Sequence, residues 1–156
     1  SLQKQVVFLF DVPVTIAGPT TMGGVAVDLN SISDYQDNKD KLKDVVDMAL
    51  LGRVTNLSPT ATSVEIWMVP NPGTLLTTEA AVRTNGVKVW GPLALAGSEV
   101  KQINWNQSAQ LFSGRQALIN EIKGDGRFDL YAIGSGTAYN FRINHGALAV
   151  VLSAGK

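Results

Sequence analysis

Apolar and polar residues alternate along the first part of the chain, which is the pattern of a half-buried β-strand. The apolar positions that share one face of this long predicted strand are Phe8, Phe10, Val12, Val14 and Ile16. Residues 25–29 repeat the alternation after a glycine-rich turn and predict a second strand. Short apolar runs between turn residues predict further strands over 53–57, 63–69, 87–90, 99–105 and 127–133.

Residues 34–52 depart from this alternation. Their apolar positions recur at the spacing of a helix face, namely Leu42, Val45, Val46, Ala49 and Leu50. Asp37, Asn38 or Asp40 can cap the start of such a helix, and Gly52 can end it. The pattern therefore predicts a helix over 41–51.

The C-terminal part of the chain predicts one more main helix and a closing hairpin. The helix is expected over 108–123, although Gly114 weakens its middle. Residues 139–144 alternate cleanly, Gly146 breaks the pattern, and 147–152 form an apolar closing strand. A hairpin between these two strands follows from the break.

These elements predict a mainly β protein in one domain over 1–156. Turn signals recur at short intervals, and the strands come in runs without regular helical crossovers. That order favours an antiparallel β-sandwich with two short-to-medium α-helices over a doubly wound sheet. Thr77 or Thr78 can also cap a short helix over 77–83.

Composition narrows the class of protein. The 156 residues are 45% hydrophobic, which excludes intrinsic disorder, and 17% charged, which is low for a cytosolic domain. The formal net charge is zero, whereas a protein that binds the phosphate backbone of nucleic acid needs a surplus of Lys and Arg. We therefore expect no nucleic-acid partner. No apolar run approaches the 18 or so residues of a membrane span, so no transmembrane segment is expected.

Much of the common catalytic repertoire is missing from the sequence. The chain has no Cys, which excludes disulfides, thiolate metal sites and Cys nucleophiles. His145 is its only histidine, so a Ser–His–acid site would have to use it, yet no Gly-x-Ser-x-Gly motif occurs. A half-exposed turn residue is the favoured interpretation of His145. We expect no enzyme activity.

Two groups of carboxylates are candidates for chemistry. Asp34, Asp37 and Asp40 could supply oxygen ligands for Ca²⁺, although the spacing of an EF-hand loop is absent. Acids at a solvated helix N-terminus explain these residues as well, and no other cofactor is expected. Glu121, Asp125 and Asp129 cluster near one turn and could supply a glycosidase pair, but turn and solvent-facing strand positions account for them.

The tryptophans are the candidate ligand-binding residues. Trp105 is flanked by Asn104 and Asn106, as in sites where rings stack on sugar faces and amides bond the hydroxyls. Trp67 lies opposite the face of its predicted strand that is assigned to the core. These four residues would form the glycan platform. Packing of the rings in the sandwich is the alternative, and it is the favoured one.

One stretch of the chain resembles known proteins. In chain order it consists of a predicted strand, Leu29-Asn-Ser-Ile-Ser-Asp-Tyr35, Asp37-Asn-Lys-Asp-Lys41, a predicted helix and Arg53-Val-Thr-Asn56. It resembles a loose group of bacterial extracytoplasmic β-sandwich domains, often lipoproteins, mostly of unknown function. The resemblance implies a location in the periplasm or at the cell surface and no enzyme activity.

The start of the chain bears on this location. It begins with Ser1 and not with Met, as expected where a signal peptide has been removed, and a tag remnant explains the same start equally well. A lipidated Cys upstream of Ser1 could tether the domain to a membrane. Two functions follow as hypotheses: an envelope-associated domain with a structural or protein-binding role, or a module that binds carbohydrate or another small ligand through exposed tryptophans.

Overall fold

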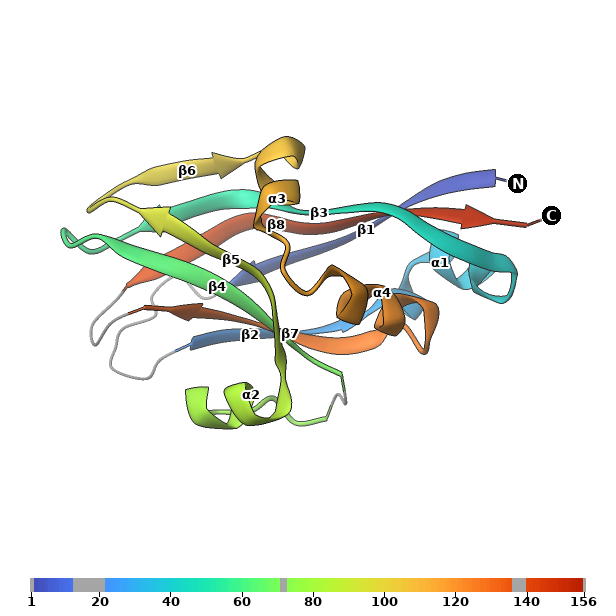
Figure 1. Ribbon diagram of the computed structural model, residues 1–156, viewed down its shortest axis with the longest axis horizontal. Coiled ribbons are helices and arrows are strands. Elements are labelled where there is room, and N and C mark those ends of the chain that lie inside the picture. Colours follow the sequence, from blue (N-terminus) through green and yellow to red (C-terminus); the bar gives the residue numbers. More distant parts are fainter. Residues whose placement is uncertain (1, 13–21, 71–72, 136–139, 156) are drawn as a thin grey trace.

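Two antiparallel sheets face one another in the computed structural model, which describes residues 2–12, 22–70, 73–135 and 140–155 (Figure 1). In spatial order the first sheet contains β1 (Leu2–Val12), β8 (Phe141–Ala154), β3 (Leu42–Asn56) and β6 (Val100–Ile103). The second contains β2 (Met22–Asp28), β7 (Arg127–Gly134), β4 (Thr62–Val69) and β5 (Val87–Leu95). The prediction of a mainly β, antiparallel sandwich is confirmed.

The main core lies between the sheets and follows the alternation of the strands. Val64, Ile66 and Met68 of β4 are buried there, as their period of two predicts. Leu148 and Leu152 of β8 reach the same core. Burying an aliphatic side chain of this size contributes about 1.5–3 kcal/mol, so this layer is the main source of stability.

The predicted helix over 41–51 is wrong. A short α1 (Ser33–Asn38) lies between single 3-10 turns, η1 (Leu29–Ser31) and η2 (Lys39–Lys41), and β3 begins directly afterwards at Leu42. The 15 residues of β3 pair with β8 along their whole length. The predicted strand over 53–57 is the far end of this same β3.

Bulges in β3 explain why its sequence imitates a helix. The register against β8 shifts between Leu42 and Asp44 and again between Val45 and Asp47. At these points Asp44 Oδ1 accepts the Val45 N–H and Asp47 Oδ1 accepts the Met48 N–H, both at 2.8 Å. Each bulge adds one residue to the repeat, so inward positions recur after three residues, as on a helix.

The predicted C-terminal hairpin is also wrong, because β8 continues through Gly146. This glycine pairs with Phe10 of β1, and a Cβ at this position would lie 2.6 Å from the Phe10 ring. His145, beside it, adopts a positive φ of 53° within the strand, not at a turn. A side chain at position 146 would not fit against Phe10. Gly146 therefore allows β1 and β8 to pack closely at this irregular point of the strand.

The helices agree better with the sequence. α2 (Glu79–Asn85) begins at the predicted cap, since Thr78 Oγ1 accepts the Ala81 N–H at 3.1 Å. The predicted helix over 108–123 is two helices, α3 (Trp105–Leu111) and α4 (Arg115–Lys123), with Gly114 at the start of the second. The predicted strand over 99–105 ends at Ile103, because Asn104 and Gln107 form a capping box that starts α3.

The α3–α4 pair closes one side of the sandwich between β3 and β5 (Figure 1). Ser108 of α3 is buried, and its Oγ accepts the Leu50 N–H of β3 at 2.8 Å. The N–H groups of Ser113 and Gly114 donate to the Val89 carbonyl of β5. Backbone groups of β3 and β5 on this side thus find partners in α3 and in the segment that joins α3 to α4. None of the helices in the described ranges is long and apolar enough to cross a membrane.

Candidate functional site

The three tryptophans do not meet on one surface. Trp90 is buried in the main core, with Nε1 3.1 Å from both the carbonyl and the hydroxyl oxygen of Ser108. Trp67 lies on the opposite face of the second sheet, where it packs against a second apolar cluster. Trp105 lies at the start of α3. The structure thus does not bring Trp67 and Trp105 together into one platform.

Both tryptophans of the predicted platform are engaged within the protein. The Trp67 ring has the Arg83 guanidinium 5.0 Å from its centroid, and its Nε1 donates to Glu65 at 3.2 Å. Trp105 is half-buried, and its Nε1 donates to Asp47 Oδ2 at 2.9 Å. Polar groups of the protein therefore already satisfy the indole N–H that a sugar hydroxyl would otherwise use.

The two asparagines beside Trp105 differ in their surroundings. Asn104 Oδ1 accepts the Gln107 N–H at 2.9 Å and caps α3. Asn106 is exposed in the first turn of the helix. Asn104 is thus explained by helix capping.

Asp34, Asp37 and Asp40 are exposed on α1 and η2. Within the described ranges, no group of three or more His, Asp or Glu side chains could hold a metal ion. Asp40 instead lies beside a polar hollow, together with Lys39. The three carboxylates thus form no metal-binding group in the described part of the chain.

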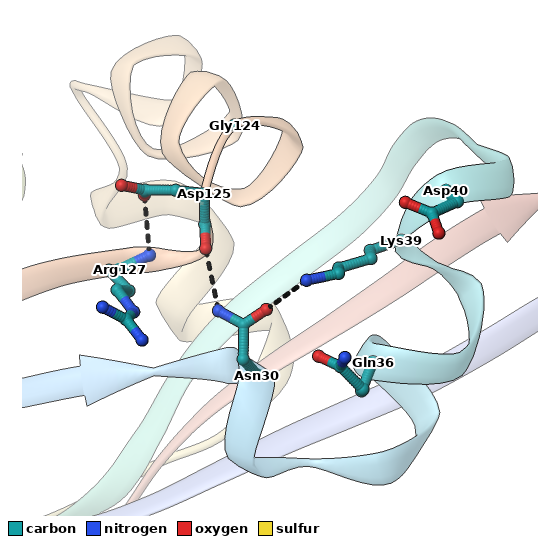
Figure 2. Close-up of a pocket in the computed structure, with 7 residues that line it drawn as sticks. All are labelled: Asn30, Gln36, Lys39, Asp40, Gly124, Asp125 and Arg127. Atoms are coloured by element: carbon teal, nitrogen blue, oxygen red, sulfur yellow. Dashed lines mark hydrogen bonds between the residues drawn. The ribbon is translucent and has the colours of Figure 1, made fainter.

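A polar hollow of about 630 Å³ lies where the η1–α1–η2 segment meets the turn between α4 and β7 (Figure 2). The residues that line it are Asn30, Gln36, Lys39, Asp40, Gly124, Asp125 and Arg127. Asn30 bridges the two sides, because its Nδ2 donates to the Asp125 carbonyl at 2.8 Å and its Oδ1 accepts Lys39 Nζ at 3.0 Å. The hollow presents hydrogen-bond donors and acceptors, with charges of both signs, to a polar ligand.

Asp28 interacts with two of the residues that line this hollow, Asn30 and Arg127. Its Oδ1 accepts the backbone and side-chain N–H groups of Asn30 at 3.0 and 2.9 Å, and its Oδ2 lies 3.6 Å from Arg127 Nε. The hydrogen bond from the Asn30 side chain lowers the pKa of the Asp28 carboxyl, and Arg127 and Lys39 lower it further. Asp28 thus stays ionised and holds both sides of the hollow in place.

Sequence patterns miss most of this hollow because its two sides are far apart in the chain. Pairing of β2 with β7 places Asp28 opposite Arg127 and so brings residues 28–40 beside residues 124–127. Of the lining residues, the sequence suggested a chemical role only for Asp40, as a Ca²⁺ ligand, and for Asp125, as a member of a glycosidase pair. It did not predict that these two residues line one hollow. The Asx-type hydrogen bond that the Asn30 N–H donates to the Asp28 carboxylate is the one local signal that marks the start of the site.

A second candidate surface follows β1, which lies at the edge of the first sheet. Within the described ranges no strand pairs with the outer side of β1. Val7 and Leu9 on its outward face are 39% and 74% exposed. A surface hollow of about 370 Å³ adjoins them, lined by Leu9, Phe10, His145 and Gly146. We call Val7, Leu9 and this hollow the β1 surface.

The comparisons add no family to this geometry. No protein-family model matches the chain, and no curated protein matches it in sequence. The candidate sites therefore stand on the physical arrangement of their residues.

Proposed function

We propose that the protein is a non-enzymatic, envelope-associated domain that binds a protein partner through the β1 surface. The observation that carries the proposal is the exposure of Leu9, at 74%, on an edge strand. An edge strand presents unpaired N–H and C=O groups that can pair with a strand of another chain. A partner strand beside β1 would extend the first sheet and bring its own outward side chains next to Val7 and Leu9.

The sequence of β1 favours such pairing. Residues 5–10 carry no charged side chain, although soluble proteins commonly place lysine or proline on edge strands to prevent association. Gln5, Val7 and Leu9 point outward while Val6 is buried. The strand therefore combines a well-anchored inner face with an apolar outer face, as a docking strand requires.

Photocrosslinking in intact cells tests this proposal. A photoreactive amino acid replaces Leu9 in one variant and Val100 in a matched control. Val100 is 57% exposed on β6, the opposite edge of the same sheet. We expect a discrete protein adduct from position 9 and none from position 100. Equal adducts at both positions, or none at position 9, would contradict binding through β1.

We propose a periplasmic or cell-surface location, with the resemblance of residues 25–56 as its support. A lipid-modified Cys upstream of Ser1 would provide the membrane tether. The gene sequence upstream of Ser1 and fractionation of the source cells test both points. A signal peptide and recovery with the envelope are expected, and a protein confined to the cytoplasmic fraction would contradict the proposal.

The polar hollow favours a second candidate function, the binding of a saccharide or another hydroxylated ligand. Two amides, two carboxylates and two cationic side chains line it, and these groups can bond vicinal hydroxyls. A glycan array tests this candidate with wild type and Arg127→Ala. Trp105→Phe is the control, since it removes the indole N–H but lies outside the hollow. Binding lost only in Arg127→Ala would assign the ligand to the hollow; binding lost only in Trp105→Phe would assign it to the tryptophan.

A further inference from the structure

The outer face of the second sheet carries a small apolar cluster of its own. Figure 1 shows α2 against this face, on the side away from the first sheet. The buried members are Val69, Val82, Tyr131 and Ile133, with Met22, Trp67 and Leu76 packed around them. Beside this cluster lies a hollow of about 210 Å³, which we call the Asp129 hollow. Its described lining residues are Val69, Gly73, Thr74, Leu76, Asn85 and Asp129.

Asp129 is the unusual member of this lining. The sequence places it at a solvent-facing strand position, but its side of β7 is covered and the residue is only 2% exposed. The Gly73 N–H donates to its carboxyl group, whereas Oδ1 is buried and has no hydrogen-bond partner among the described residues. A buried carboxylate oxygen without a donor is costly, so Asp129 Oδ1 can accept a hydrogen bond from a bound ligand at low cost.

The other polar groups of the hollow are acceptors as well. Asn85 Nδ2 donates one of its two N–H groups to the Ala81 carbonyl at 2.8 Å, and Oδ1 is left as an acceptor. Thr74 contributes a hydroxyl group. Nearby, the Tyr131 hydroxyl oxygen accepts the Leu76 N–H at 2.8 Å. The hollow is thus suited to a ligand that donates several hydrogen bonds.

The carboxyl group of Asp129 indicates which charge a ligand of this hollow should carry. Among its described lining residues Asp129 alone is ionisable, and the described chain holds no group of three metal-binding side chains. A Ca²⁺ ion commonly requires several oxygen ligands that include more than one carboxylate. One carboxylate with neutral acceptors instead matches a single positive charge that carries N–H groups. Val69 and Leu76 offer apolar walls for a short methylene chain.

We propose that the Asp129 hollow binds a primary ammonium group, with the Asp129 carboxylate as its counter-ion and Asn85 Oδ1 and the Thr74 hydroxyl as further acceptors. The ammonium group can belong to a small free amine or to a lysine side chain. Burial raises the pKa of Asp129, and a bound cation would favour the ionised carboxyl and offset that effect. The site is on the sheet opposite β1, so it stands independently of the proposed protein partner.

NMR titration of the wild-type protein with butylammonium chloride tests the site. The probes are the Gly73 amide, which donates to Asp129, and the Trp67 indole N–H in the adjacent cluster. We expect saturable shifts of both signals. Tetramethylammonium carries the same charge but no N–H donor, so it is expected to produce no saturable shift. Equal saturation by both cations would overturn the proposal, as would absence of saturation by butylammonium.

Two variants locate the counter-ion. Asp129→Asn keeps the shape of the side chain and removes its charge, so butylammonium binding is expected to weaken by about tenfold or more. Asp34→Asn, an exposed carboxylate on α1, is the matched control and should leave binding unchanged. Equal weakening in both variants would indicate non-specific cation binding and overturn the assignment. Because the comparison of the two cations uses wild type, the test does not depend on the folding of a variant.

A lysine derivative distinguishes the two sources of the ammonium group. Nα-acetyl-lysine methylamide presents the side chain as a peptide does. Tighter binding of this derivative than of butylammonium assigns the site to a lysine of a partner, and the reverse order assigns it to a free amine. Failure of both ligands to saturate the Gly73 signal would overturn the site for either source.

Discussion

Ser108 shows at the residue scale how one hydroxyl group joins three elements. Its Oγ accepts the Leu50 N–H of β3 and lies 3.1 Å from Trp90 Nε1 of β5. The residue is fully buried at the point where α3 closes the sandwich. A buried polar group is stabilising only where it has hydrogen-bond partners, and the Ser108 hydroxyl oxygen has one on each of the two strands.

Replacing Ser108 by Ala should therefore destabilise the protein. The change leaves the buried Leu50 N–H without its acceptor, at an expected cost of about 1–3 kcal/mol in the free energy of unfolding. Urea denaturation measures this value. Ser113→Ala is the control, because this exposed hydroxyl makes only a 3.3 Å bond to the Lys88 carbonyl. If both variants lose the same stability, Ser108 is not the junction described here.

Asp129 gives a prediction for pH at the same scale. Burial raises its folded pKa above the ordinary 3.8, so the folded state binds the proton more tightly than the unfolded state. Its favourable contribution is present below pH 3.8 and is lost as pH rises through the folded pKa. Tyr131, the neighbouring titratable group, has its pKa raised by burial from 10.0 and stays neutral throughout this range.

The free energy of unfolding of Asp129→Asn relative to wild type should therefore increase as pH rises from about 3.8 toward neutrality. Denaturation of both proteins at a series of pH values measures the difference. A difference that is constant over this range would show that Asp129 is not desolvated in the folded protein.

β3 is the element in which sequence and structure differ most. Val46 lies on the core face of the predicted helix, whereas in the bulged strand it is 46% exposed and Met48 is buried. Val46→Asp should thus change the free energy of unfolding by less than about 0.5 kcal/mol. Met48→Asp should cost at least about 2 kcal/mol, since it buries an unpaired charge. A large loss in Val46→Asp and a small one in Met48→Asp would support the helix.

The same element explains what sequence patterns can and cannot predict here. Strands with strict alternation, such as β4, and the capped helix α2 agree with prediction because their signals are local. β3 disagrees because Asp44 and Asp47 create bulges whose three-residue step equals the spacing of a helix face. β8 disagrees because Gly146 serves a contact with Phe10, a residue more than a hundred positions away.

The candidate sites follow this rule as well. Asp34, Asp37 and Asp40 are close in sequence, yet on α1 and η2 they are exposed and belong to no metal-binding group in the described ranges. The polar hollow and the Asp129 hollow both depend on residues that only the sheet pairing or the packing of α2 brings together. Such sites carry no local signature, so pattern analysis could not predict them.

At the scale of the whole molecule the sandwich is asymmetric. The α3–α4 pair covers the side between β3 and β5, while β1 lies at an edge that no described strand pairs with. The β5 edge of the second sheet is therefore closed by backbone hydrogen bonds from Ser113 and Gly114, whereas the β1 edge of the first sheet presents Val7 and Leu9. This difference between the two sides is the physical basis for the proposed partner at β1.

Amide hydrogen exchange along β1 tests this claim most directly, with the partner identified by crosslinking added to the labelled protein. Because successive N–H groups of a strand point to opposite sides, those that point away from β8 have no strand partner in the described part of the free protein. Addition of a partner strand should slow exchange at alternate residues of β1 and leave the amides of β6, at the opposite edge, unchanged. If exchange in β1 is the same with and without the partner, the partner does not bind by pairing with this strand.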